Sequence, residues 1–173
     1  MQIEFENELN DLVAFNRYHF RNSRSMQFWY RIGFILGPVF GITYALLLYR
    51  WSLPARIAVA LGVSIVGAAM NWTYYRWWVA YSARKLAGEG ENKGVLCDHV
   101  IAITEEGLRE TTQVSESRST WTGIERIVEN EEYVFIYISA CQAHVIPKRA
   151  FASEKDSKEF IEQARLFRSS RTA

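Results

Sequence analysis

Charged side chains are absent from two long runs in the middle of the chain, residues 32–49 and 57–75. At about 1.5 Å per helical residue, each run covers a hydrocarbon core of about 30 Å. The remaining residues could hardly cover two helices that are apolar on every face inside a soluble domain. We therefore predict two transmembrane helices, at about 32–49 and 57–77, joined by a tight turn that contains Pro54.

Small residues recur every four positions in both runs. They are Gly33, Gly37, Gly41 and Ala45 in the first run, and Ala60, Ser64 and Ala68 in the second. Because such faces let two helix backbones approach closely, we assign Gly33, Gly37 and Gly41 to helix packing. Packing within the hairpin and self-association of two copies both fit this pattern.

The first 27 residues change period. Ile3 and Phe5 alternate with polar residues as in a short strand, whereas the apolar positions from Leu9 to Phe20 follow helical spacing. We predict a strand and then an amphipathic helix from about Glu8 to Asn22. Two positions for this helix remain open, in the lipid headgroup layer or docked against the C-terminal domain.

After a glycine-rich linker at 83–94, apolar residues alternate with a period of two. Six short strands are predicted from Asp98 to Ile146, among them 108–114 and 119–121, with Trp121 in the core. Ser153 caps a final helix with an apolar stripe that includes Phe160.

These elements predict an α+β membrane protein. A transmembrane hairpin at 28–82 precedes a C-terminal domain at 95–169, an antiparallel β-barrel or curled sheet closed by the last helix. If the N-terminal strand supplies a seventh strand, the hairpin is an insertion within this domain.

The charge distribution predicts the orientation. The outer flanks of the runs carry eight cations (Arg17, Arg21, Arg24, Arg31, Arg76, Arg84, Lys85 and Lys93), and the turn between them carries two (Arg50 and Arg56). Cations concentrate on the cytoplasmic side, so both termini are expected in the cytoplasm, at the inner membrane. From residue 88 onward, the chain has eleven Lys and Arg residues and fifteen Asp and Glu residues. This net negative charge argues against nucleic-acid binding.

Candidate chemistry is sparse. Cys97 with His99 and Cys141 with His144 offer four nitrogen and sulfur ligands of the kinds that zinc accepts, but alternation along the strands does not direct them to one point. We expect unrelated strand-end residues, free thiols and no metal, cofactor or catalytic residue. Adjacent carboxylates at 105–106 and 131–132 lie in predicted turns, where they are normally solvated.

Five cations are candidate ligands for anionic lipid. Lys148 and Arg149 lie between the last strand and the last helix, and Arg76, Arg84 and Lys85 follow the second apolar run. The alternative is that Lys148 and Arg149 are solvated loop cations. Each cation near an anionic surface contributes about 1 kcal/mol of attraction.

A series of short motifs resembles one family. In chain order these are Ile3-Glu4-Phe5 with Phe15, Tyr18 and His19, the double apolar run, residues 103–108, 121–124, 132–137 and 146–151. Together they resemble the YcxB-like bacterial membrane proteins, whose C-terminal domain is similar to pleckstrin-homology-like domains. The resemblance implies a fold and a position at the inner membrane face, and it carries no catalytic residue or ligand.

We therefore expect a membrane-anchored, non-enzymatic interaction or regulatory module. Its expected partners are the lipid bilayer and a protein partner or a second copy of the chain, without nucleic acid. The alternatives are an anionic-lipid-sensing domain and an accessory subunit of a membrane enzyme or transporter.

Overall fold

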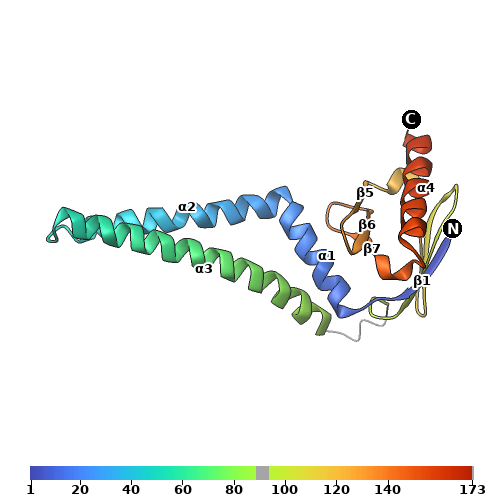
Figure 1. The fold of residues 1–173 in the computed structure, drawn as a ribbon, viewed down its shortest axis with the longest axis horizontal. Coiled ribbons are helices and arrows are strands. Elements are labelled where there is room, and N and C mark those ends of the chain that lie inside the picture. Colours follow the sequence, from blue (N-terminus) through green and yellow to red (C-terminus); the bar gives the residue numbers. More distant parts are fainter. Residues whose placement is uncertain (89–93, 173) are drawn as a thin grey trace. The chain divides into compact units, whose positions relative to one another are not determined.

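The computed structural model describes residues 1–88 and 94–172. The middle of the predicted linker, residues 89–93, lies outside the described residues. Two compact units are present, Asn16–Lys85 and a second unit that combines Met1–Phe15 with Leu86–Ala173. The elements (Figure 1) are β1 (Gln2–Glu6), α1 (Leu9–Asn22), α2 (Arg24–Leu47), α3 (Leu53–Gly88), β2 (Asp98–Ile103), β3 (Gly107–Thr112), β4 (Glu116–Thr120), β5 (Arg126–Glu129), β6 (Tyr133–Tyr137), β7 (Ala143–Pro147) and α4 (Glu154–Thr172).

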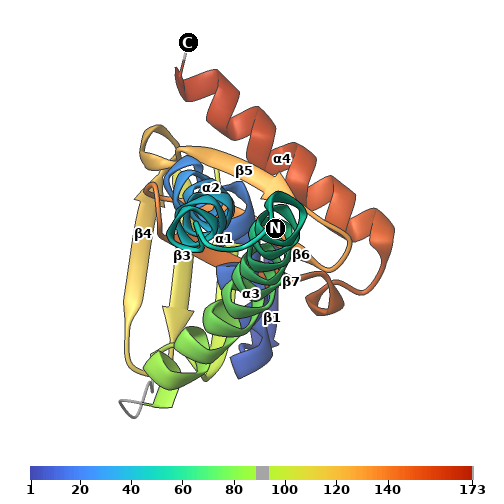
Figure 2. The same cartoon turned by 90° about the vertical axis from the view of Figure 1, so that its left-hand side faces the viewer.

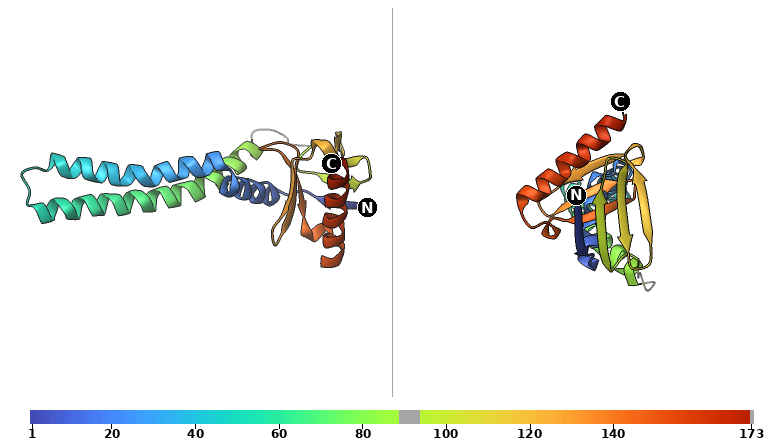
Figure 3. Two further views of the ribbon diagram at one scale, coloured as in Figure 1. Left: turned by 90° about the horizontal axis from the view of Figure 1, so that it is seen from above. Right: turned by 90° about the vertical axis from the view of Figure 1, so that its right-hand side faces the viewer.

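The helices α2 and α3 run side by side as an antiparallel hairpin (Figure 3). Both are long and apolar enough to cross a membrane. Their backbones approach closely: a Cβ added to Gly37 would lie 3.4 Å from the Ser64 carbonyl oxygen, and one added to Gly41 would lie 2.5 Å from that of Ala60. The small side chains on the two helices thus make this close packing possible.

The four-stranded sheet, sheet A, has the order β1-β2-β3-β4 and is antiparallel throughout. Its edge strand β1 pairs with β2, with Ile3 opposite Ile101 (Figure 3, right). The strand that precedes the hairpin therefore joins the first strand that follows it. The N-terminal strand does supply a seventh strand, and the hairpin is an insertion within one folded domain.

The three-stranded sheet, sheet B, has the order β5-β6-β7 and is also antiparallel. The predicted closed barrel is wrong, because among the described residues no β-ladder joins β4 to β5. Between them the chain makes a short 3-10 turn at Trp121–Gly123, where the Trp121 side chain is 1% exposed. Its indole Nε1 donates to the Thr104 carbonyl oxygen at 2.8 Å. This hydrogen bond holds the Trp121 side chain in the core at the point where sheet A ends and sheet B begins.

Two predicted strand boundaries are also wrong. The strand expected at 108–114 ends at Thr112, because the Thr112 hydroxyl accepts hydrogen bonds from the backbone N–H groups of Val114 and Ser115 and closes the turn early. The strand expected at 119–121 is the end of β4, which begins at Glu116. Such local side-chain bonds to the backbone compete with strand pairing.

The core lies between the two sheets and under α4. Sheet A contributes Ile101 and Leu108, sheet B contributes Val134 and Ile146, and α4 contributes its predicted apolar stripe. In Figure 2, α4 lies beside β5, and its Phe167 packs on the Trp121 ring at 5.7 Å. The Ser153 hydroxyl accepts from the Asp156 N–H, so the predicted cap is confirmed.

The other face of sheet B is covered by the first half of α1. The Phe15 ring lies 5.7 Å from that of Phe135 and 5.8 Å from that of Tyr137. Every residue of β6 is consequently buried, since one face meets sheet A and the other meets α1. Residues 9–15 of the amphipathic helix thus dock on the C-terminal domain.

Candidate functional site

A buried carboxylate, Asp11, holds the start of α1 to the C-terminal domain. The Arg149 guanidinium donates two hydrogen bonds to it, each 2.7 Å long, and the Tyr133 hydroxyl donates a third at 2.9 Å. The backbone N–H of Glu8 donates to it at 2.7 Å, as a capping carboxylate in the first helical turn does. Asp11 is fully buried, and these four hydrogen bonds satisfy its carboxylate.

The charge of this Asp11 cluster is stable over a wide pH range. Burial alone would raise the pKa of Asp11, but the hydrogen bonds and the charge of Arg149 outweigh it and lower that pKa. Burial and the hydrogen bond to Asp11 raise the pKa of Tyr133 to about 12. The Asp11 cluster is therefore a fixed ion pair near neutral pH.

The structure places the five candidate lipid-binding cations in different environments. Arg149 forms ion pairs with Asp11 and Glu8, and the Lys148 ammonium lies 3.1 Å from the Glu129 carboxylate. Arg76 lies over the Trp72 ring at 5.5 Å and is exposed, as are Arg84 and Lys85 on the same helix. The Lys148–Arg149 pair and the α3 cations belong to different units.

A second buried polar cluster joins β2, β3 and β7. The two carboxylate oxygens of Glu110 each meet a histidine, His99 Nδ1 at 2.8 Å and His144 Nδ1 at 2.8 Å. Both imidazoles are buried, and the Glu110 side chain is 19% exposed. His99 Nε2 lies 3.1 Å from the Val95 carbonyl oxygen, and the Phe5 ring stacks on the His99 ring.

The pKa values in this His99–Glu110–His144 cluster follow from its hydrogen bonds. Burial would raise the pKa of Glu110, but the hydrogen bonds with the two histidines lower it to about 2. Burial would lower the pKa of His99, yet the hydrogen bond and the charge of Glu110 raise it. The cluster therefore holds an ionised carboxylate at neutral pH.

The expectation that the two histidines are unrelated is wrong, because Glu110 brings them together. Cys97 and Cys141 are free thiols, as expected, and Cys141 is exposed. Among the described residues, no group of three or more His, Cys, Asp or Glu side chains could hold a metal ion. The adjacent carboxylates at 105–106 and 131–132 are solvated.

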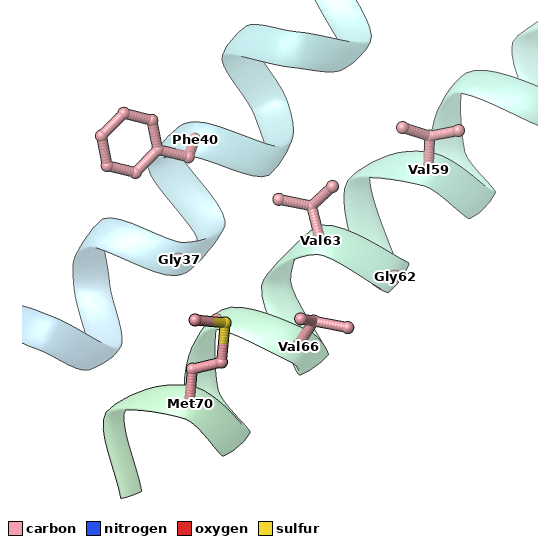
Figure 4. A pocket seen from close by; sticks show the side chains of 8 residues that line it. Gly37, Phe40, Val59, Gly62, Val63, Val66 and Met70 are labelled. Atoms are coloured by element: carbon pink, nitrogen blue, oxygen red, sulfur yellow. The ribbon is translucent and has the colours of Figure 1, made fainter. Parts of the chain in front are cut away.

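The part of the chain that the structure describes has at least two hollows that are open to the outside. One lies between α2 and α3, has a volume of about 530 Å³ and is entirely apolar (Figure 4). Three of its lining residues are glycines, Gly37, Gly62 and Gly67, and Gly62 has open space in front of it. The other, of about 250 Å³, lies on the outer face of sheet A beside Val100, Ala102 and Thr111.

The sequence contained signals for both buried carboxylates. Asp11 lies one turn before Phe15 in the predicted helix and so shares the face of this aromatic residue, where a buried acid requires a partner. Glu110 is two residues after the buried Leu108 and therefore shares its inward face. Their side-chain partners on other elements lie 11 to 138 positions away, so spacing along the chain could not identify them.

Comparison with known proteins identifies one family. The model of the family described as YcxB-like protein matches residues 103–164. The matched segment runs from the last residue of β2 into α4, so the resemblance to YcxB-like proteins is confirmed over this part of the chain. A comparison with curated proteins gives no significant match.

Proposed function

We propose that this chain, with its YcxB-like segment, is a membrane-anchored, non-enzymatic interaction or regulatory module at the inner face of the cell membrane. The anchor is the α2–α3 hairpin. The module is the seven-stranded domain closed by α4, which we propose to be pleckstrin-homology-like.

The observation that carries this proposal is the pairing of β1 with β2. A strand before the hairpin and a strand after it belong to one sheet. Two antiparallel spans return the chain to the side from which it entered, so strands from before and after the hairpin can share one sheet only on one side of the bilayer. The excess of cations at those ends favours the cytoplasmic side.

The side chains along the hairpin support insertion. Exposed Trp29 and Trp72 occur at one end of the apolar stretch, and exposed Tyr49 and Trp51 occur at the turn. The stretch of α3 from Leu53 to Trp72 measures about 30 Å at 1.5 Å per residue, which matches a hydrocarbon core with aromatic side chains at both boundaries.

A pair of reporters tests the topology. An enzyme active only outside the cytoplasm should be active when inserted at Ser52 and silent when fused after Ala173. The reverse pattern would overturn the orientation, and silence at both positions would overturn membrane insertion.

A second experiment tests the interaction role. A photo-crosslinking amino acid at Val100, beside the hollow of sheet A, should capture a defined protein in native membranes. The same group at Glu162, on the exposed side of α4, is the matched control. Capture of a membrane enzyme or transporter at Val100 would favour the accessory-subunit role instead.

Exposed cations on α3 support a second candidate, binding of anionic lipid. Arg76, Arg84 and Lys85 are exposed on the part of α3 that follows Trp72, where headgroups would surround them. Lys148 and Arg149 contribute less to this candidate, since each forms an ion pair within the domain. Replacing the three α3 cations with Gln should reduce co-purified anionic lipid, and the Lys148→Gln variant should retain it.

A further inference from the structure

Among the described residues, the hydrogen bond between Glu110 and His144 is the only side-chain ion pair or hydrogen bond that joins sheet A directly to sheet B. His99 and Glu110 belong to β2 and β3 in sheet A, and His144 belongs to β7 in sheet B. Trp121 and α4 close the core at the end of β2 that leads to Thr104, whereas His99 lies near the beginning of β2. The cluster thus links the two sheets at the end that α4 does not close.

The contacts of His99 determine its protonation. Its Nδ1 faces a carboxylate oxygen and its Nε2 faces a carbonyl oxygen, and both of these atoms only accept hydrogen bonds. A neutral imidazole has one N–H group and could satisfy only one of them. Both hydrogen bonds require the doubly protonated, positively charged ring.

The contacts of His144 are different. Its Nδ1 donates to the second oxygen of Glu110, while its Nε2 is buried and has no hydrogen-bond partner among the residues that the structure describes. That arrangement fits a neutral ring protonated at Nδ1, because an N–H at Nε2 would be buried with no acceptor. The cluster then consists of one cation, one carboxylate and one neutral imidazole, with no net charge.

We propose that the His99–Glu110–His144 cluster is a pH-sensitive latch between the two sheets, closed while His99 carries two protons and loosened when it loses one. Deprotonation removes one of the two hydrogen bonds of His99 and leaves the Glu110 carboxylate, largely buried, without its counter-charge. An uncompensated charge in such a position is costly, so β7 separates more readily from β2 and β3.

The neighbouring charges favour the closed state at neutral pH. Among the described residues, Glu110 and the more weakly acting Asp98 are the acidic groups that stabilise the charged His99 ring. The adjacent strand β1 contributes the uncharged ring of Phe5, which stacks on His99 at 5.8 Å. Because Phe5 is also paired with His99 in the β-ladder, loosening the latch weakens the hold on the N-terminal strand as well.

The direction of the pH effect follows from linkage. A histidine whose pKa is raised on folding stabilises the fold fully below its unfolded pKa of about 6.5, and that stabilisation is lost as the pH rises through the folded pKa. The latch therefore opens on the alkaline side. One coupled proton increases the open population by up to about tenfold per pH unit between the unfolded pKa and the folded pKa, and by no more above the folded pKa.

Nitrogen NMR of histidine-labelled full-length protein in lipid nanodiscs tests the protonation states directly. At pH 6.5 we expect a signal from a ring with both nitrogens protonated that is absent from the His99→Gln spectrum. A neutral His99 ring at pH 6.5 in the unaltered protein would overturn the proposal, whether or not the variants fold.

Hydrogen exchange tests the latch itself. After correction for the intrinsic pH dependence of exchange, protection of β7 amides should fall by up to about tenfold per pH unit between about pH 6.5 and the folded pKa of His99, and should level off above that pKa. Glu110→Gln should abolish this dependence, and the matched control Glu116→Gln, an exposed carboxylate on β4, should retain it. Equal pH dependence in Glu110→Gln and in the unaltered protein would contradict the latch.

Discussion

At the scale of single residues, the Asp11 cluster shows how a buried charge determines what a neighbouring cation does. Arg149 has a partly exposed side chain and follows a strand-ending proline, features typical of a solvated or ligand-binding cation. Its guanidinium instead neutralises a carboxylate that is fully buried. The main role of Arg149 is therefore to hold α1 on sheet B.

Substituting Arg149 tests this role. Arg149→Gln leaves the Asp11 carboxylate buried without a counter-charge, which should lower the free energy of unfolding by about 3–5 kcal/mol. Lys148→Gln removes a more exposed pair with Glu129 and should cost less than about 1 kcal/mol. Thermal unfolding of both variants, monitored by circular dichroism, checks the difference; equal losses would contradict the buried role of Asp11.

Glu110 should determine the acid stability of the domain. Its pKa falls from an ordinary value of 4.5 to about 2, so its stabilising effect is fully present above pH 4.5 and is lost as the pH falls through about 2. The Glu110→Gln variant should be less stable than the unaltered protein at pH 6 by about 3 kcal/mol, and the difference should shrink below pH 4. Denaturant unfolding at several pH values measures this; a difference independent of pH would show that Glu110 is protonated in the fold.

At the scale of elements, the packing of α2 on α3 depends on the absence of side chains. A Cβ at Gly41 would overlap the Ala60 carbonyl oxygen, whereas Gly62 faces open space. Small residues at a helix contact thus have different roles according to what lies opposite them.

Two substitutions separate these roles. Gly41→Leu should drive the helices apart and reduce disulfide cross-linking between cysteines introduced at positions 37 and 64, because the backbone of Ala60 cannot move out of the way. Gly62→Leu, the matched control, should leave this cross-linking unchanged. A loss of cross-linking between copies in Gly62→Leu alone would show that the hollow in Figure 4 receives a second copy.

Trp121 is the residue on which the junction of the two sheets depends. Trp121→Ala removes the ring that packs on Phe167 and leaves a cavity, which should lower the free energy of unfolding by about 3–5 kcal/mol. Trp121→Phe retains most of the packing and loses the hydrogen bond to Thr104, so its cost should be smaller. Similar melting of Trp121→Ala and the unaltered protein would contradict a core role.

At the scale of the whole molecule, the domain is built from both ends of the chain. Residues 1–15 supply the edge strand of sheet A, the carboxylate that binds Arg149 and the aromatic ring that covers sheet B. The C-terminal segment alone would expose the edge of β2 and the outer face of β6. Unpaired edges and apolar faces of this kind promote aggregation.

A comparison of two soluble fragments tests this dependence. Residues 95–172 alone should be unfolded or aggregated. The same residues preceded by residues 1–15 and a flexible linker should fold as a monomer with a cooperative melting transition. Cooperative folding of 95–172 alone would show that the N-terminal residues are dispensable for the domain.

The sequence by itself determined the elements whose signals are local. Two uncharged runs specify long apolar helices, because their length and composition suffice, and the periods of two and 3.6 specify the strands and α4. The Ile3–Phe5 alternation and the Ser153 cap are visible for the same reason. Turn positions near Thr112 and Trp121 were less predictable, since single hydrogen bonds from side chains determine where a strand ends.

Only the tertiary structure decided the separation into two sheets and the partners of Asp11 and Glu110. A hydrogen bond between Asp11 and Arg149 spans 138 positions, and one between Glu110 and His144 spans 34. Alternation reveals that a charged residue faces inward, but it does not reveal which distant strand brings its partner. That choice depends on how the two sheets, α1 and α4 bury their apolar faces together, which is a property of the whole fold.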